Sequence, residues 1–224
     1  MSKTLEPQYN IFLDTASKHG VTRLGVSVNH AWHEDPKHVL FTLARYKFVA
    51  RMLAGKQNVL EIGCGDAFGT RLVQQTTKHV TAVDFDPVFV RDVVERAVPS
   101  WPLTCFVHNI VDGPVEGEFD GIYCLDVLEH IDPVLEPRLL RNLLLSLGAN
   151  GTLILGTPSK QSQIYASPQS VAGHFNCKTG DQLRGMLEEY FCNVLMFSMN
   201  DEVIHTGFMS MANYLFAVAC NPRI

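Results

Sequence analysis

Residues 61–65, Glu-Ile-Gly-Cys-Gly, combine a carboxylate with a glycine-rich turn at the end of an apolar run. Glycines at positions 63 and 65 let the backbone approach a ligand closely. A carboxylate two residues before the first glycine would repel a pyrophosphate, whereas it suits a ligand with a cationic end. Phe68 also stands where a dinucleotide-binding fingerprint needs its third glycine, so the sequence disfavours a nicotinamide oxidoreductase.

A second group of residues that could do chemistry follows the apolar run 119–125. It consists of Asp126, Glu129 and His130. One helical turn would present all three side chains to one side. His130 could be the general base for an acceptor hydroxyl. Alternatively, the three residues could bind a divalent metal such as Mg²⁺ or Mn²⁺, which lowers the pKa of the acceptor. In a third reading His130 only shapes a pocket. Asp126 and His130 are the catalytic candidates.

A third candidate is Asp84, nineteen residues after Gly65 and at the end of another apolar run. A carboxylate in this position can accept both hydroxyl hydrogens of a ribose. Asp84 could instead cap the helix that begins at Pro87. Asp86 is the better N-cap, because it immediately precedes the proline, and this leaves Asp84 available to a ligand.

The elements that must position these residues alternate along the chain. Apolar runs and helical spacing together predict an α/β fold, in which a parallel sheet is covered by helices on both faces. The predicted strands are 58–63, 79–84, 103–108, 119–125, 151–156, 191–199 and 212–220. The predicted helices are 36–54, 68–77, 87–97, 134–147 and 179–190.

Four sequence blocks resemble, in family order, those of the class I S-adenosylmethionine-dependent methyltransferases. The resemblance implies a Rossmann-like sheet of seven strands in the order 3-2-1-4-5-7-6, with the seventh strand antiparallel. It also implies S-adenosylmethionine as cofactor and S-adenosylhomocysteine (SAH) as product. The blocks are 58–69, 80–87, 119–131 and 151–158.

The resemblance assigns roles at the cofactor. Arg45 corresponds to an arginine that holds the cofactor carboxylate in ubiquinone-biosynthesis O-methyltransferases, although it could also belong to a solvated helix face. Asp84 would bind the ribose and Phe85 the adenine face. Asn109 would contact the adenine amino group, unless it is only a turn residue. The full implied set is Arg45, Glu61, Gly63, Gly65, Asp84, Phe85, Asn109, Ile110 and Leu125.

The resemblance also extends to a metal site. Ubiquinone-type O-methyltransferases and small-RNA 2′-O-methyltransferases carry a metal site with the spacing of Asp126, Glu129 and His130. In the RNA enzymes a further histidine follows the fifth strand, and His174 stands at a comparable place. The implied metal ligands are therefore Asp126, Glu129, His130 and His174.

The bulk composition limits the partners. The 224 residues suit one domain, with 1–35 as a lid or substrate segment and 36–220 as the core. A net charge of −5 disfavours DNA and RNA. Six cysteines without metal spacing favour a reducing cytoplasm, and the absence of a long apolar run argues against membrane insertion. A homo-oligomer is compatible with these numbers.

Together these patterns predict methyl transfer to a small soluble acceptor through a hydroxyl oxygen. A faint resemblance of the segment from Asp35 to Phe48 to surface-polysaccharide methyltransferases suggests a sugar, a sugar nucleotide or a phosphorylated metabolite. The alternatives are an RNA 2′-O-methyltransferase and a non-catalytic partner subunit that binds S-adenosylmethionine.

Overall fold

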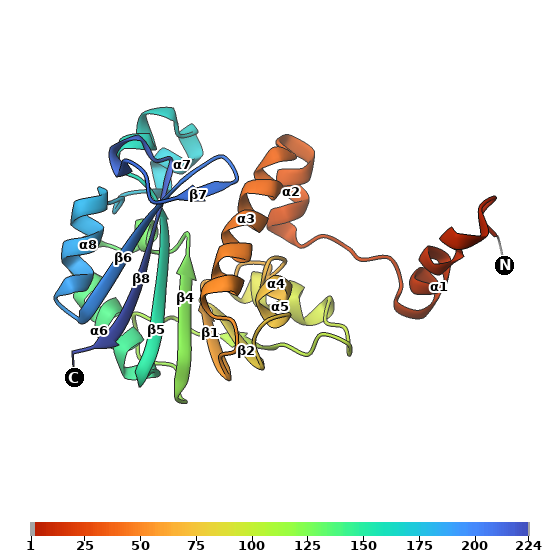
Figure 1. The fold of residues 1–224 in the computed structure, drawn as a ribbon, viewed down its shortest axis with the longest axis horizontal. Helices are drawn as coiled ribbons and strands as arrows, with labels where there is room; N and C mark the ends of the chain where they lie inside the picture. Colours follow the sequence, from red (N-terminus) through yellow and green to blue (C-terminus); the bar gives the residue numbers. More distant parts are fainter. Residues whose placement is uncertain (1–2, 224) are drawn as a thin grey trace.

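Eight strands form one sheet in residues 3–223, the part of the chain that this computed structural model describes (Figure 1). The strand order is β3-β2-β1-β4-β5-β8-β6-β7. All neighbours from β3 to β5 pair in parallel, and β8 pairs antiparallel with both β5 and β6. The strands are β1 (Asn58–Ile62), β2 (His79–Asp84), β3 (Thr104–Val107), β4 (Phe119–Leu125), β5 (Leu147–Pro158), β6 (Phe191–Asn200), β7 (Val203–His205) and β8 (Tyr214–Pro222).

The predicted order of seven strands is confirmed, with β8 as the antiparallel seventh strand, but the predicted number is too small by one. The additional edge strand, β7, pairs antiparallel with the end of β6. Only two residues separate them, and Asp201 has a φ of 51°. Aspartate tolerates this left-handed conformation, so a tight turn can reverse the chain where a longer connection was expected.

Side chains alternate between the two faces of the sheet and so build two cores. In β4, Ile122 and Cys124 pack on one side with helices α6 and α8, whereas Tyr123 and Leu125 pack on the other with α3 and α4. The helices are α1 (Asn10–His19), α2 (Val26–Glu34), α3 (Lys37–Met52), α4 (Thr70–Gln74), α5 (Pro87–Glu95), α6 (Glu136–Ser146), α7 (Pro168–Gly173) and α8 (Gly180–Glu188).

Two predicted boundaries differ from the structure by more than two residues. Helix α4 is shorter than the predicted 68–77, because the hydroxyls of Thr76 and Thr77 both donate to the carbonyl of Val73 and end the helix. Strand β5 begins at Leu147, four residues before the predicted start, because the chain passes from α6 into extended structure without an intervening loop.

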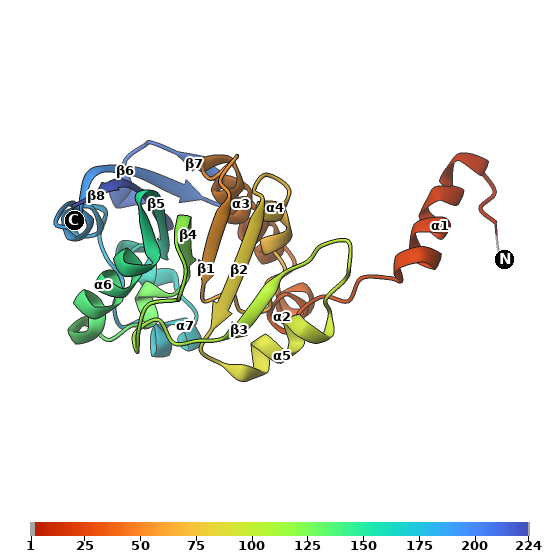
Figure 2. The same cartoon turned by 90° about the horizontal axis from the view of Figure 1, so that it is seen from below.

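Residues before α3 form two helices of different character. Helix α2 packs against α3, whereas α1 projects away from the rest of the molecule on an extended linker (Figures 1 and 2). The predicted lid segment is therefore divided, and only α2 contacts the core that carries the site. Within residues 3–223, no helix is long and apolar enough to cross a membrane.

Candidate active site

The loop after β1 is shaped by two glycines and fastened to β2. Gly63 and Gly65 have φ values of 71° and 51°, which glycine adopts without strain. The Asp84 carboxylate accepts hydrogen bonds from the amide of Gly65 at 2.8 Å and from the amide of Asp86 at 2.9 Å. The Asp86 side chain accepts from Val88 and caps α5, as predicted. Asp84 is therefore not the helix cap.

Glu61 is fully buried and ties two helices to β1. Its two carboxylate oxygens accept hydrogen bonds from the hydroxyls of Tyr46 in α3, at 2.7 Å, and Thr70 in α4, at 2.5 Å. A Cβ on Gly69 would overlap the Tyr46 ring, so glycine is required there. Burial raises the pKa of Glu61 to about 7, against the lowering effect of the Thr70 and Tyr46 hydrogen bonds. Tyr46 and Thr70 were not predicted as site residues from the sequence.

The predicted adenine residues line one hollow beside β3. Phe85 is 71% exposed there. The Asn109 amide oxygen accepts from the amide of Val111 at 3.2 Å, and its nitrogen donates to Asp112 at 3.1 Å. Asn109 therefore has the turn role, and its contact with adenine stays a prediction. Ile110, next to it, is buried. His108 also lines the hollow and was missed.

Arg45 and Asp126 face each other at the end of β4. Nη1 of Arg45 lies 2.7 Å from Oδ2 of Asp126. The guanidinium carbon of Arg45 is 3.9 Å from the centre of the Tyr214 ring, and Arg45 Nε is buried without a hydrogen-bond partner in residues 3–223. Asp126 has a φ of 55° and follows the buried Leu125. Arg45 and Asp126, for which separate ligand roles were predicted, thus form an ion pair.

Three of the four predicted metal ligands converge. Glu129, His130 and His174 each offer one ligand atom, and these atoms lie within 4.8 Å of one another. The two imidazole ring centres are 5.0 Å apart. Asp126 is not in this group, because its carboxylate is turned toward Arg45. The structure therefore brings together one carboxylate and two imidazoles, where four ligands were predicted.

Hydrogen bonds orient both imidazoles in the same way. Nδ1 of His130 lies 2.9 Å from the carbonyl oxygen of Gly173, and Nδ1 of His174 lies 3.1 Å from the amide oxygen of Gln163. Both partners can only accept, so each Nδ1 donates its proton. In the neutral rings the lone pair is then on Nε2, as in histidines that bind metal.

Glu129 is the buried member of this group. Burial, together with the charge of Asp126, raises the pKa of Glu129 to about 8, although the Thr157 hydroxyl donates to its carboxylate at 3.1 Å. The pKa of His174 is lowered by burial and by the neighbouring His130. The backbone carbonyl of Glu129 accepts from the amides of residues 175 and 176, and these bonds draw the His174 segment to the site.

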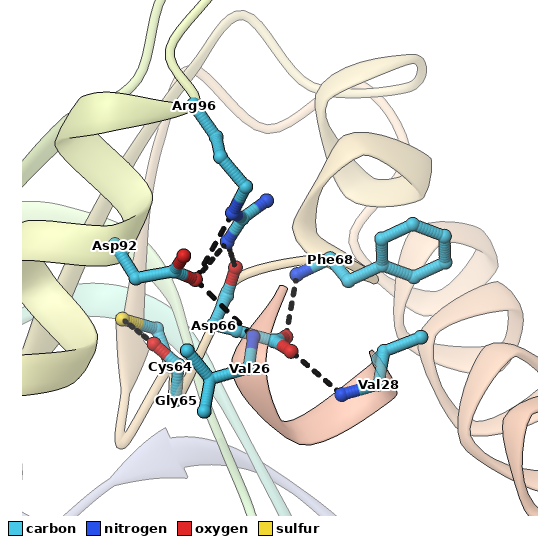
Figure 3. A network of polar contacts seen from close by, with 8 residues as sticks. All are labelled: Val26, Val28, Cys64, Gly65, Asp66, Phe68, Asp92 and Arg96. Atoms are coloured by element: carbon cyan, nitrogen blue, oxygen red, sulfur yellow. Dashed lines mark hydrogen bonds and ion pairs between the residues drawn. The ribbon is translucent and has the colours of Figure 1, made fainter. Parts of the chain in front are cut away.

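A further polar network fastens α2 to the loop after β1, which we call the cofactor loop for its predicted role (Figure 3). The Asp66 carboxylate accepts from the amide of Val28 at 2.8 Å, and Asp92 in α5 accepts from the amide of Val26 at 3.3 Å. Arg96 pairs with Asp92 at 2.8 Å and also donates to the backbone of Asp66. These residues were not predicted from the sequence, since their contacts join three separate parts of the chain: α2, α5 and the loop after β1.

Known proteins resemble both the sequence and the fold. A model of the methyltransferase domain family matches residues 5–195. A ubiquinone biosynthesis O-methyltransferase of Xanthomonas campestris pv. campestris is 28% identical over 146 residues, which are 62% of this chain and 60% of the relative. The mitochondrial enzyme of that name from Schizosaccharomyces pombe is 32% identical over 113 residues, 48% of this chain and 39% of the relative.

The fold has a counterpart among solved structures. The N-methyltransferase NodS from Bradyrhizobium japonicum, in complex with SAH, matches with a TM-score of 0.60 at 19% identity, over 86% of this chain and 92% of that chain. The chain spans at most about 60% of the length of the two curated relatives. Because the family model covers most of the chain and the sheet has the predicted order, the chain belongs to the methyltransferase domain family, within the class I S-adenosylmethionine-dependent methyltransferases.

Proposed function

We propose that the chain transfers a methyl group to a hydroxyl oxygen of a small acceptor, assisted by a divalent cation held by Glu129, His130 and His174. The observation that carries this proposal is the convergence of these three side chains just beyond β4, at the edge of the sheet where α/β proteins bind ligands. The names of both curated relatives, which are O-methyltransferases, support oxygen as the methylated atom.

The chain offers a partner for each end of the cofactor. S-adenosylmethionine, when bound, supplies a methyl group on a sulfonium. The Asp84 oxygens keep lone pairs beyond their two backbone hydrogen bonds, so the carboxylate can accept from ribose hydroxyls. The exposed ring of Phe85 is available to the adenine face. Arg45 has donors other than the one that Asp126 occupies, and these can hold a carboxylate.

The donor set of the Glu129 group fits a divalent cation. Nε2 of both histidines carries a lone pair, and Thr157 is the one side chain that donates to the Glu129 carboxylate among the described residues. One carboxylate and two imidazoles suit a borderline or hard cation such as Mn²⁺ or Mg²⁺. Such a cation, when bound, supplies positive charge that lowers the pKa of a nearby hydroxyl. Without it, His130 Nε2 would take the proton alone.

The surroundings of His174 favour an acceptor with an apolar body. Tyr165, Val171 and Phe175 flank His174 in the chain and are 83%, 57% and 58% exposed. Exposed apolar side chains in the segment that carries a polar site residue are compatible with an apolar ligand. A hydroxyl carried on an apolar ring or chain fits these residues better than a sugar nucleotide does.

A methyl-transfer assay with a panel of hydroxylated acceptors tests the proposal. Activity with an apolar phenol or alcohol is expected to disappear after chelation and to return with Mn²⁺ or Mg²⁺. Activity that chelation leaves unchanged, but that His130→Ala abolishes, would instead establish the base-only mechanism. Methylation of amines but of no hydroxylated acceptor would contradict the choice of oxygen.

A further inference from the structure

Tyr214 reaches the site because β8 runs against its neighbours. The parallel strands end at the edge that carries the cofactor loop and the Glu129 group, whereas antiparallel β8 begins there. Tyr214, the first residue of β8, pairs with Pro158, the last residue of β5. A residue from the far end of the sequence is thereby placed beside the functional edge.

The ring of Tyr214 is held between a cation and another aromatic ring. The guanidinium carbon of Arg45 lies 3.9 Å from its centre, and the Phe216 ring centre is 5.0 Å away. Tyr214 is 2% exposed. A guanidinium over an aromatic face is attracted to the ring, and this attraction is stronger in a buried site. The stack therefore limits the orientations that Arg45 can adopt.

The Tyr214 hydroxyl is enclosed and has no hydrogen-bond partner among the described residues. A Cβ on Gly156 would lie 2.7 Å from this oxygen and equally close to the Leu125 side chain. Gly156 thus makes room for the hydroxyl, and the strand ends cover it. Because the Tyr214 hydroxyl is enclosed, a ligand at the site would contact Arg45, which packs on the Tyr214 ring, and not the hydroxyl.

We propose that Tyr214 is a positioning residue whose aromatic ring holds the Arg45 guanidinium between the cofactor carboxylate and Asp126. This inference rests on the proposed role of Arg45 at the cofactor. Arg45 pairs with Asp126 through Nη1 at 2.7 Å, which leaves its other nitrogens to a ligand. A guanidinium fixed in this way would connect the cofactor pocket to the catalytic residues beyond β4.

The test is calorimetric titration with SAH of wild-type protein and of Tyr214 variants. Tyr214→Leu is expected to weaken SAH binding about tenfold, because the guanidinium loses its aromatic support. Tyr214→Phe keeps the ring and is expected to bind SAH with wild-type affinity. Phe191→Leu is the matched control, since Phe191 is equally buried but belongs to the opposite core. Tyr214→Met is a second ring-free variant that fills more of the space.

A double-mutant cycle with Arg45→Met separates positioning from a general loss of structure. If the ring acts through Arg45, Tyr214→Leu should cause no further loss of SAH affinity in the Arg45→Met background. The inference is overturned if the tenfold loss persists in that background, if Tyr214→Phe binds as poorly as Tyr214→Leu, or if Tyr214→Leu binds normally. Failure of Arg45→Met to weaken SAH binding would remove the proposed role of Arg45 as well.

Discussion

Each half of the site contains one buried glutamate, and the two are bonded differently. Glu61, in the cofactor half, has both oxygens occupied by hydroxyls from α3 and α4. Glu129, in the acceptor half, receives one side-chain hydrogen bond within the described part of the chain, from Thr157. Burial is the largest cause that raises the pKa of both, to about 7 and about 8. A buried carboxylate with few donors is costly unless a ligand or proton joins it.

The difference indicates separate tasks for the two halves. In the proposed cofactor half, the protein's own hydrogen bonds hold Glu61 to α3 and α4, and separate bonds hold Asp84 to the loop after β1. The acceptor half presents Nε2 atoms and a carboxylate that still have capacity for a ligand. Changes in the first half should therefore alter stability or SAH affinity, and changes in the second should alter turnover.

The largest effect is expected from the two imidazoles. His130→Ala and His174→Ala should each lower the methyl-transfer rate by about 10²-fold or more, because each removes a cation ligand. Their SAH dissociation constants should stay near wild type. His205→Ala is the control, since His205 lies in β7 outside the group. A severe loss in His130→Ala with a mild one in His174→Ala would favour His130 as a metal-free base.

Glu61→Gln should change the dependence of stability on pH. An ordinary glutamate has a pKa of 4.5, whereas in the folded protein the pKa of Glu61 is raised to about 7. The unfolded chain therefore binds fewer protons within this window, and the free energy of unfolding falls as pH rises from 4.5 to 7. Glu61→Gln removes that fall, so between pH 4.5 and 8 the difference in unfolding free energy between the variant and wild type should shift in favour of the variant by about 3 kcal/mol.

Urea unfolding of wild type and Glu61→Gln between pH 4 and 8 measures this effect. The gap between the two unfolding free energies should widen as the pH rises and become constant above pH 7. Parallel curves would mean that folding does not raise the pKa of Glu61, and Glu61 and Glu129 would then differ in pKa as well as in hydrogen bonding.

Asp84→Ala should weaken SAH binding by about 2–3 kcal/mol, because two hydrogen bonds to the ribose are lost. Asp86→Ala provides the comparison, since Asp86 caps α5 and has no predicted role at the cofactor. It should lower thermal stability through the lost cap and leave the SAH dissociation constant unchanged. Equal SAH affinities in the two variants would remove the ribose role of Asp84.

The smallest predicted effect concerns the attachment of α2. Asp66→Ala removes the acceptor for the Val28 amide and should destabilise α2 locally by about 1 kcal/mol. Hydrogen exchange of the α2 amides measures this loss, and exchange in β4 should be unaffected. Unchanged protection of α2 would show that packing on α3 holds the helix without Asp66.

Local patterns predicted the parallel part of the fold, because hydrophobic periodicity and turn residues determine structure over short stretches of sequence. Asp86 was identified as a cap from its place before Pro87, and the structure confirms it. The extra strand β7 was missed because it depends on the left-handed conformation of Asp201, which no neighbouring glycine signals.

Contacts between distant elements could not be predicted in the same way. Tyr46, Thr70 and Tyr214 contribute through partners in other secondary-structure elements, and their residue types alone suggest ordinary core positions. The pairing of Arg45 with Asp126 was also missed, since the sequence does not record which charges face each other. The His174 position was found only through family resemblance, and the structure brings it beside His130.

Electron paramagnetic resonance of Mn²⁺, titrated into the SAH-saturated protein, tests the central claim most directly. The account predicts saturable binding of one ion per chain, lost in His174→Ala and retained in His205→Ala. Absence of saturable binding in the wild-type protein, or equal binding by the His174→Ala variant, would contradict the assignment of Glu129, His130 and His174 as a cation site.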